Sequence, residues 1–449
     1  MWHKNKLLLL SVSLLLQLST KAQIENYEED STYIRTADAS NFQILKLKKS
    51  YVLGDGITFQ SGFRKINFTQ SLQTSFSANS FNKNLSSFNS AFDINRARLT
   101  IIGNPIDNKI SLVARLNFSS NLQSVTSGNR SFNTPLQEAY IEYRPNRKHV
   151  FNFGLRADYI DSRETRTEGE NLAFINRSAL SSSFDAIFDY GFRYKGTYKL
   201  GGRHLLKPYA SITTGDSRSG LQKNFGGFKY GVRIDYLPFD KFQKGGEFYM
   251  EDLAREEKPK LVIGGIFSYN DGATSALGTN GGRFQYGDLN QNILLPKFTK
   301  MGVDYLFKYN GFYSMGSYFA TRATVPTNIK GEFRLNGSFS SYPTTQTESQ
   351  TNDLVKNRLN LGAAYNVQAG YLLKSDWALG LRYTRLNANA VSANFAQYNK
   401  YYTFVATKYL SANNLKVQTE IGYDELNNTL KTLTQKGNFY AQVMFTVQL

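Results

Sequence analysis

Apolar and polar residues alternate with a period of two along most of this chain, in runs of roughly ten positions. The clearest run is the last one, in which one face consists of Phe439, Ala441, Val443, Phe445, Val447 and Leu449. The other face consists of Tyr440, Gln442, Met444, Thr446 and Gln448. Such a period predicts β-strands, because successive side chains of a strand point to opposite faces. The runs exceed the roughly five or six residues of an average soluble strand.

The links between these runs alternate between short turns, such as 374–376, and long polar loops, such as 324–357. This alternation is typical of transmembrane β-barrels, which place short turns in the periplasm and long loops outside the cell. Counting back from the C-terminus predicts an all-β protein, a transmembrane antiparallel β-barrel of about 16 strands. The expected strands are 65–77, 95–103, 109–118, 136–143, 149–157, 191–200, 204–214, 227–237, 261–270, 300–309, 312–323, 358–373, 376–386, 398–410, 413–424 and 438–449.

Two segments do not follow this pattern. The link 238–260 is long although it falls on the periplasmic side, and its part 247–256 is expected to form a short helix. Residues 23–56 show neither a strand period nor a helix period and carry mixed charge, which predicts a mobile N-terminal periplasmic tail. The transmembrane β-barrel is therefore expected to span residues 57–449.

Residues 1–22 have the three parts of a secretory signal peptide. A basic stretch with Lys4 and Lys6 precedes the apolar run 7–18, and small residues before Gln23 predict cleavage after Ala22. The apolar run is shorter than the roughly 20 residues that a membrane-spanning helix needs. An exported chain that forms a barrel is expected in the bacterial cell outer membrane.

Composition and charge narrow the choice of class. The 449 residues include 33 Phe and 29 Tyr but no Cys, which excludes disulfides and thiolate metal sites. A mean hydropathy of −0.41 argues against a bundle of membrane helices. Tyr and Phe near strand ends, as at Tyr371 and Tyr402, suit the aromatic girdles of a barrel. The formal charge of +18 on an exported chain without binding motifs indicates small ions rather than nucleic acid.

Several short segments occur in a common order over residues 50–449. They are 54–61 (GDGITFQS), 94–99 (INRARL) with Gly103, 136–143 (LQEAYIEY), 175–180 (INRSAL) with 189–193 (DYGFR), 367–373 (VQAGYLL) and 378–383 (ALGLRY). These segments resemble the phosphate-selective porin O and P family of bacterial outer membranes, with Asn95 where a further arginine is common. The resemblance implies an often trimeric channel of about 16 strands, narrowed by a long inward-folded loop.

Charged side chains in a water-filled pore act on every ion that passes within a Debye length, and Arg or Lys residues favour anions. Strand parity predicts that the pore lining contains Arg96, Arg98, Arg115, Arg156, Arg193, Lys195, Arg233 and Arg382, together with Lys199, Arg358 and Lys416. The same parity places fewer acidic residues inside, namely Glu138, Glu142, Asp235, Asp304 and Glu420. The expected function is a porin for passive diffusion of small hydrophilic solutes with a mild preference for anions. Arg96 and Arg98 have a second interpretation, as ion-pair partners of Glu138 and Glu142 that hold the shape of the barrel.

The candidate constriction loop is 158–190, with Arg163, Arg166 and Arg177 as its basic residues. It is net negative, because it also contains Asp158, Asp161, Glu164, Glu168, Glu170, Asp185 and Asp189. Phosphate selectivity would require a dense cluster of guanidinium forks at this point. Phosphate is therefore one candidate solute, and a broad channel that mildly favours anions fits better.

An enzyme is not expected, and no catalytic residue, metal site or cofactor is predicted. His149 and His204 begin strands beside short periplasmic turns, whereas a barrel hydrolase needs its histidine near a nucleophile at the outer rim. A second function remains open: a non-channel barrel that serves surface binding, adhesion, assembly or secretion through loops 271–299 and 324–357.

The expected partners follow from the membrane location. They are outer-membrane lipid and lipopolysaccharide, small anions such as phosphate, two further copies in a homotrimer, and the barrel-insertion machinery, which is expected to recognise residues 439–449; nucleic acid is not expected.

Overall fold

The chain divides into two compact units, residues 1–47 and 48–449. The structure, a computed structural model, describes residues 46–47, 52–62, 64–81, 88–105, 109–119, 123–126, 129–132, 135–215, 226–276, 285–334, 337–432 and 435–449. The first unit contributes only β1 (Lys46–Leu47) to the description. The predicted signal peptide and most of the predicted tail therefore lie outside the described residues. None of the described helices has the length and apolar character needed to cross a membrane.

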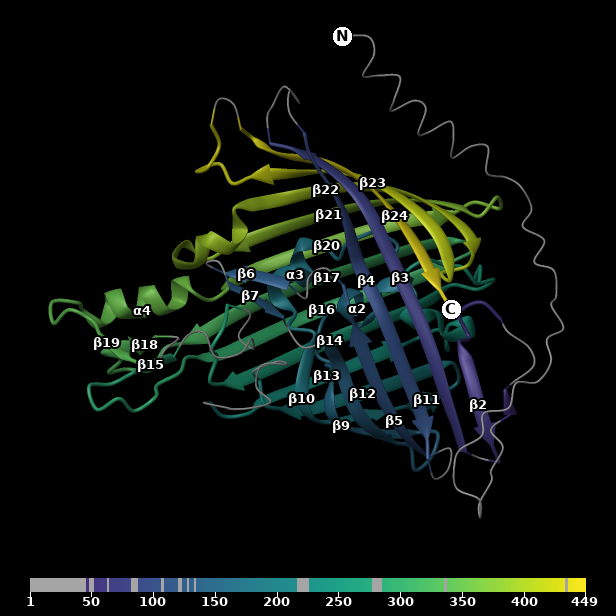
Figure 1. Cartoon of the computed structure of the whole chain (residues 1–449), viewed down its shortest axis with the longest axis horizontal. Helices are drawn as coiled ribbons and strands as arrows, with labels where there is room; N and C mark the ends of the chain where they lie inside the picture. Colours follow the sequence, from purple (N-terminus) through teal and green to yellow (C-terminus); the bar gives the residue numbers. More distant parts are fainter. Residues whose placement is uncertain are drawn as a thin grey trace, which may run out of the picture. The chain divides into compact units, whose positions relative to one another are not determined.

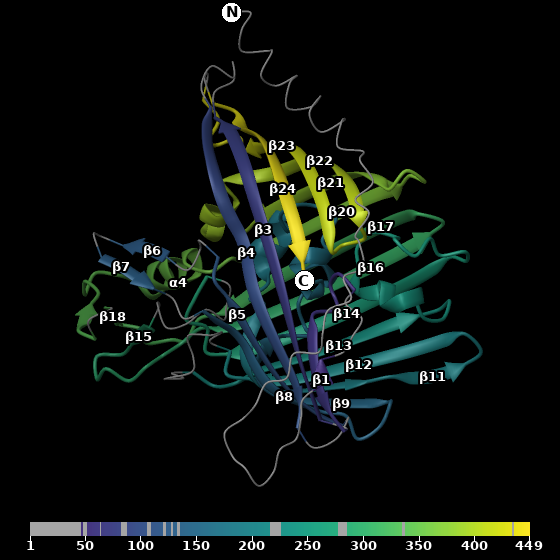
Figure 2. The ribbon, with the colours of Figure 1, turned by 45° about the vertical axis from the view of Figure 1, so that its right-hand side comes forward.

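Sixteen of the described strands form a closed antiparallel barrel (Figures 1 and 2). Each strand pairs with its neighbour in chain order, and β24 closes the ring on β3, with Val443 opposite Phe76. The strands are β3 (Arg64–Ser80), β4 (Asn89–Asn104), β5 (Ile110–Asn117), β8 (Leu136–Tyr143), β9 (His149–Ala157), β10 (Phe188–Gly196), β12 (His204–Thr213), β13 (Lys229–Leu237), β14 (Lys260–Asp271), β16 (Lys297–Tyr309), β17 (Phe312–Thr324), β20 (Gly362–Leu372), β21 (Trp377–Ala388), β22 (Tyr398–Ser411), β23 (Leu415–Leu426) and β24 (Gly437–Gln448).

Shorter elements surround or enter this barrel. The strands are β2 (Ile57–Ser61), β6 (Gln123–Thr126), β7 (Asn129–Phe132), β11 (Tyr198–Gly201), β15 (Gln285–Gly287), β18 (Gly331–Phe333) and β19 (Phe339–Ser341). The helices are α2 (Arg163–Arg166), α3 (Ala179–Phe184) and α4 (Glu348–Asn357), with 3-10 helices η2 (Gly169–Asn171), η4 (Gln243–Phe248) and η5 (Ala390–Ala396). Of these, β15, β18 and β19 form a small separate sheet in the long loops.

The polar face of the strands lies inside the barrel and the apolar face lies outside. In β13, Lys229, Arg233 and Asp235 are buried, whereas Val232 and Ile234 are each 52% exposed. In β24, Gln442 and Thr446 are buried and Phe445 is 50% exposed. This inverted pattern suits a barrel in lipid, and it confirms the predicted all-β transmembrane fold.

Two local predictions are wrong. The strand expected at 358–373 begins at Gly362, because Thr347 and Gln350 form a capping box that starts α4 just before it. Arg358 caps this helix and pairs with Glu332 at 2.5 Å, so it lies in the long-loop region and not in the pore lining.

The helix expected over 247–256 is also absent at that position. The segment forms η4 at Gln243–Phe248, and residues 249–259 contain no helix. Its backbone groups bind the barrel instead: the Lys308 ammonium donates to the carbonyl oxygens of Gly246 and Glu251, and the Asn310 N–H donates to that of Glu256.

The two described histidines belong to aromatic clusters near the short turns. His149 Nδ1 lies 2.9 Å from the Tyr194 hydroxyl, and its ring also contacts Tyr198. His204 Nδ1 lies 2.8 Å from the Tyr236 hydroxyl, and the two rings are stacked. Both histidines are thus engaged by tyrosines, and among the described residues neither contacts a nucleophile or a carboxylate.

Candidate functional site

The segment between β9 and β10 folds into the barrel and contacts its inner wall (Figure 1). We call residues 158–187 the inward loop. Its short helices begin at serines, since Ser162 accepts from the Thr165 N–H and Ser178 accepts from the Ser181 N–H. The loop lies where the sequence predicted a constriction, and the structure shows how it is held.

A cluster of buried charges attaches α2 to strands β13 and β16. Asp304 accepts from both terminal nitrogens of Arg233, at 2.6 and 2.9 Å, and from the backbone N–H of Arg163 at 3.0 Å. The Arg163 guanidinium pairs with Asp235 at 2.9 Å. Gly264 leaves room for these groups, because a Cβ there would lie within 2.7 Å of Arg233, Asp235 and Asp304. Each charge has an opposite partner, which is the condition for burying it at tolerable cost.

Two lysines of the wall hold the two ends of the inward loop. The Lys300 ammonium lies 2.5 Å from Asp161 and 3.1 Å from Asp185. The Lys229 ammonium lies 3.3 Å from Asp158 and 3.1 Å from Asp189, at the point where the loop returns to β10. The acidic residues that make the loop net negative therefore serve as its attachment to a basic wall.

The middle of the inward loop is attached to the opposite wall through its backbone. Lys416 donates to the Leu172 carbonyl at 2.7 Å, and Gln418 donates to the Ala173 carbonyl at 2.7 Å. Glu420 accepts from the Ile175 N–H at 2.9 Å. The loop thus extends from β13 and β16 to β23 and divides the interior.

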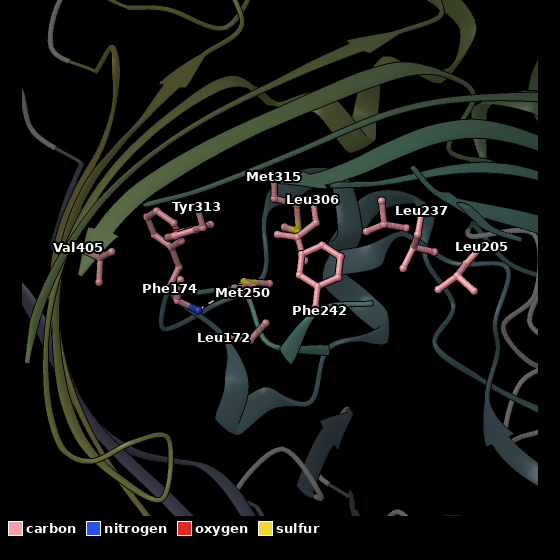
Figure 3. Close-up of a cluster of buried hydrophobic side chains, with 12 residues drawn as sticks. Leu172, Phe174, Leu205, Leu237, Phe242, Met250, Leu306, Tyr313, Met315 and Val405 are labelled. Atoms are coloured by element: carbon pink, nitrogen blue, oxygen red, sulfur yellow. Dashed lines mark hydrogen bonds between the residues drawn. The ribbon is translucent and has the colours of Figure 1, made fainter. Parts of the chain in front are cut away.

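A second segment enters from the end with the short turns. We call residues 238–259 the periplasmic insertion. Its Met250 N–H donates to the Asn171 carbonyl at 3.3 Å, and the Met250 sulfur lies 3.4 Å from the Ala173 N–H. Figure 3 shows Met250 and Phe242 beside Leu172 and Phe174 of the inward loop. The surrounding wall contributes Leu205, Leu237, Val262, Leu306, Tyr313, Met315 and Val405 to the same buried cluster.

The periplasmic insertion buries three acidic residues, Glu251, Asp252 and Glu256, and Glu251 is the one with a strongly shifted pKa. Glu251 accepts from the Tyr409 hydroxyl and lies within electrostatic range of Lys416 and Lys308. Burial raises the pKa of Glu251 to about 7, and the two lysines oppose this shift. By contrast, Glu332 in the long-loop sheet has a lowered pKa, because the hydrogen bond and charge of Arg358 outweigh its partial burial.

Open space remains on the side of β23, β24, β3, β4 and β5. A cavity of about 470 Å³, which we call the vestibule, is lined by Arg177, Arg382, Tyr401, Asp424 and Tyr440 among others. A second cavity, of about 80 Å³, shares Arg177 with the vestibule. A third cavity, also of about 80 Å³, shares Arg98, Arg115 and Glu168 with the second. The last cavity includes Gln448, at the end with the short turns. The three cavities form a series along one wall.

The narrow part of this series is lined by Arg98, Arg115, Arg177 and Glu168, which we call the arginine window. Arg115 pairs with Glu168 and with Glu138, both at 2.9 Å. Arg98 pairs with Glu170 at 3.2 Å and with Glu168 at 3.5 Å. Arg177 donates to the Thr167 carbonyl at 2.7 Å, and no ion pair of Arg177 is found within the described part of the chain. The window therefore combines paired and unpaired guanidinium groups.

The predicted pore-lining residues fall into two groups. Those that line a cavity are Arg98, Arg115, Arg166, Arg177 and Arg382. Those held within contacts are Arg96 (Gln73), Arg156 (Glu142 and Tyr159), Arg163 (Asp235), Arg193 (carbonyls of Gly154, Arg156 and Asp189), Lys195 (rings of Tyr209 and Phe248) and Arg233 (Asp235 and Asp304). Within the described part of the chain, Arg98 forms no ion pair with Glu138 or Glu142, because it pairs with Glu168 and Glu170 of the inward loop.

Sequence reasoning missed the two lysines that hold the inward loop. Lys229 shares its face with Arg233, and Lys300 shares its face with Asp304, so strand parity was sufficient to find both. Parity gave no information on their partners, because Asp161 lies 139 positions from Lys300 along the chain.

A closed barrel with an apolar exterior and an inward loop defines the class: an outer-membrane β-barrel of the porin type. Residues 66–253 match the family model of phosphate-selective porin O and P, which confirms the resemblance predicted from the sequence. No curated protein matches the chain. The family match and the barrel fold support an outer-membrane porin channel and indicate a location in the bacterial outer membrane, and they favour a channel over an enzyme.

The chain is similar to several solved outer-membrane proteins at low sequence identity. OprB of Pseudomonas putida is 10% identical, with a TM-score of 0.52 over 86% of this chain and 94% of that one. OmpF of Salmonella typhi is 11% identical, with a TM-score of 0.49 over 86% and 98%. An anion-selective porin from Comamonas acidovorans is 8% identical, with a TM-score of 0.48 over 86% and 100%.

Proposed function

We propose that ions and small hydrophilic solutes cross this porin through the vestibule and the arginine window, with a mild preference for anions. The observation that carries this proposal is the charge balance of the window. Glu168 of the window and the neighbouring Glu170 are paired with arginines, whereas Arg177 has no ion-pair partner among the described residues. Arg96 lies within electrostatic range of both Arg98 and Arg177 and adds to the positive charge.

The small size of the cavities makes this charge effective. A Debye length is about 8 Å at physiological ionic strength, so an ion in an 80 Å³ cavity is not screened from the side chains that line it. Low-dielectric protein on both sides strengthens the interaction further. An excess of guanidinium groups then lowers the energy of anions and raises that of cations.

The same geometry argues for broad anion preference over phosphate specificity. Phosphate is bound well by guanidinium forks that present two free N–H groups. The forks of Arg98 and Arg115 already bind Glu168, Glu170 and Glu138. A phosphate would have to displace these carboxylates, so we expect chloride and phosphate to be favoured to a similar degree.

Planar bilayers with a potassium chloride gradient test the proposal. We expect a reversal potential on the anion side, which moves toward zero in the variant Arg177→Gln because one unpaired positive charge is removed. The matched control is Arg334→Gln, which removes an exposed arginine from the long-loop sheet and leaves the potential unchanged. A cation-side potential of the unmodified protein would refute the anion preference, and absence of conductance would refute the proposed path.

Phosphate is examined in the same bilayers by adding it at constant ionic strength. Block of chloride current by submillimolar phosphate would overturn the broad preference in favour of a specific phosphate site. A homotrimer, lipopolysaccharide contacts and recognition by the insertion machinery stay predictions, as does the mobile periplasmic tail.

A further inference from the structure

The vestibule carries charges of both signs, and we call Arg177 with Arg382 its basic wall and Asp424 with Asn438 and Asn79 its acidic wall. Its lining includes Arg177 from the inward loop and Arg382 from β21, and it includes Asp424 from β23. A volume of about 470 Å³ is room for a small organic molecule as well as water, whose share of liquid volume is about 30 Å³. The vestibule lies on the long-loop side of the arginine window, where a solute from outside arrives first.

The basic wall retains unused donors. Arg382 donates one terminal nitrogen to the Asn176 carbonyl at 2.7 Å and lies 3.6 Å from Glu164. Arg177 uses one terminal nitrogen on the Thr167 carbonyl, and its buried Nε has no hydrogen-bond partner in the described structure. A buried N–H without a partner costs free energy, which a bound acceptor would recover.

The acidic wall retains unused acceptors. Asp424 of β23 lies opposite Asn438 of β24, whose side chain donates a hydrogen bond to its carboxylate. Asn79 lies on the next strand, β3, opposite Tyr440. The side-chain oxygens of Asn438 and Asn79 are buried without a hydrogen-bond partner among the described residues. Arg382 acts on Asp424 electrostatically, yet no basic group of the described chain lies within ion-pair distance of this carboxylate.

We propose that the vestibule binds small zwitterionic solutes of the amino-acid type, a step that rests on the proposed channel function. The solute's carboxylate meets Arg177 and Arg382, and its ammonium meets Asp424 with the oxygens of Asn438 and Asn79. An ammonium has three donors and no acceptor, which matches this group of oxygens. The rings of Tyr401 and Tyr440 also line the vestibule, and in this binding mode they contact the carbon chain.

Block of single-channel current by 6-aminohexanoate tests this assignment. Two derivatives each lack one charge: N-acetyl-6-aminohexanoate lacks the ammonium, and the methyl ester lacks the carboxylate. We expect the zwitterion to block at least about tenfold more tightly than either derivative, because each loses a charge-assisted contact. In the variant Asp424→Asn, the zwitterion should block no better than its N-acetyl derivative.

The control variant is Asp353→Asn, which removes an exposed carboxylate on α4 and should leave block by the zwitterion unchanged. Folding of each variant is checked by the change in its migration on heating in detergent gels and by its unblocked conductance. Equal block by the zwitterion and its N-acetyl derivative would overturn the proposal in favour of a plain anion site. Normal conductance without any block would overturn it and leave the proposed function intact, whereas a silent unmodified protein would refute both.

Discussion

The two sides of the barrel interior differ in what their charged residues contact. On the side of β12–β17, Arg233, Lys229 and Lys300 are buried against carboxylates, and apolar groups fill the remaining space. A cavity on this side has a volume of about 10 Å³, which is no more than one water molecule requires. On the side of β23, β24 and β3–β5, the vestibule and the arginine window stay open.

The comparison shows that a charged side chain can point into the barrel without lining the open space through which ions pass. Arg233 and Arg98 point to the same side of their strands, yet Arg233 is fully buried and Arg98 lines two cavities. The difference is made by the inward loop and the periplasmic insertion. They cover β12–β17 and the middle of β23, and they leave open space toward β24 and β3–β5. The packed side should therefore control stability, and the open side should control ion flow.

The largest effect on stability is expected for Asp304→Asn on the packed side. The substitution leaves Arg163 and Arg233 buried with one carboxylate, Asp235, between them. Breaking such a buried pair costs about 3–5 kcal/mol. Urea unfolding in detergent measures this loss, and single-channel recordings should show a higher conductance because α2 is released.

Asp271→Asn, which breaks an exposed pair with Lys297 at 3.4 Å, is the control and should cost at most about 1 kcal/mol. If Asp304→Asn and Asp271→Asn lowered the free energy of unfolding equally, the packed side would not control stability.

The next effect concerns the contact between the inward loop and the periplasmic insertion. Met250→Ala removes a fully buried side chain from the centre of the apolar cluster, which costs about 2–5 kcal/mol. The same unfolding assay measures it. Met301→Ala is the control, because Met301 lies on the lipid-facing side of β16 and is 40% exposed. If Met301→Ala loses as much stability as Met250→Ala, packing of the periplasmic insertion against the inward loop does not stabilise the barrel more than an exposed side chain does.

A smaller effect is expected from pH. The pKa of Glu251 is raised from its ordinary 4.5 to about 7, so the folded state holds this proton more tightly than the unfolded state. Stability should therefore fall as pH rises from about 4.5 to about 7, by roughly 1–3 kcal/mol, and stay constant above that range. Unfolding curves over this range measure the slope. Glu251→Gln should remove this component, and the exposed Glu348→Gln should preserve it. A slope that survives in Glu251→Gln would assign the pH dependence to other groups.

The smallest effect on stability is expected on the open side. Arg177→Gln removes a guanidinium without an ion-pair partner among the described residues, so the free energy of unfolding should change by less than about 1 kcal/mol. The same variant is expected to shift the reversal potential. A loss comparable to that of Asp304→Asn would show that Arg177 holds the inward loop and that the two sides do not differ as described.

Much of this arrangement follows from the sequence. The period of two in 438–449 and 227–237 identified the strands and their two faces, and the alternation of link lengths gave the order of turns and loops. Local signals failed at 358–361, where the alternation predicted a strand, because α4, which its capping box starts at Glu348, ends at Asn357 and the chain enters β20 only at Gly362.

The role of each lumen-facing charge was decided by the tertiary structure alone. Parity is a local property, so the sequence determined that Arg98, Arg233 and Lys300 point inward. Whether such a side chain is covered depends on segments far away along the chain: Arg163 lies 141 positions from Asp304, and Ile175 lies 245 positions from Glu420. The positive charge of the sequence thus predicted an attraction for anions, and only the folded inward loop separated the charges that hold the barrel together from those that a passing ion can reach.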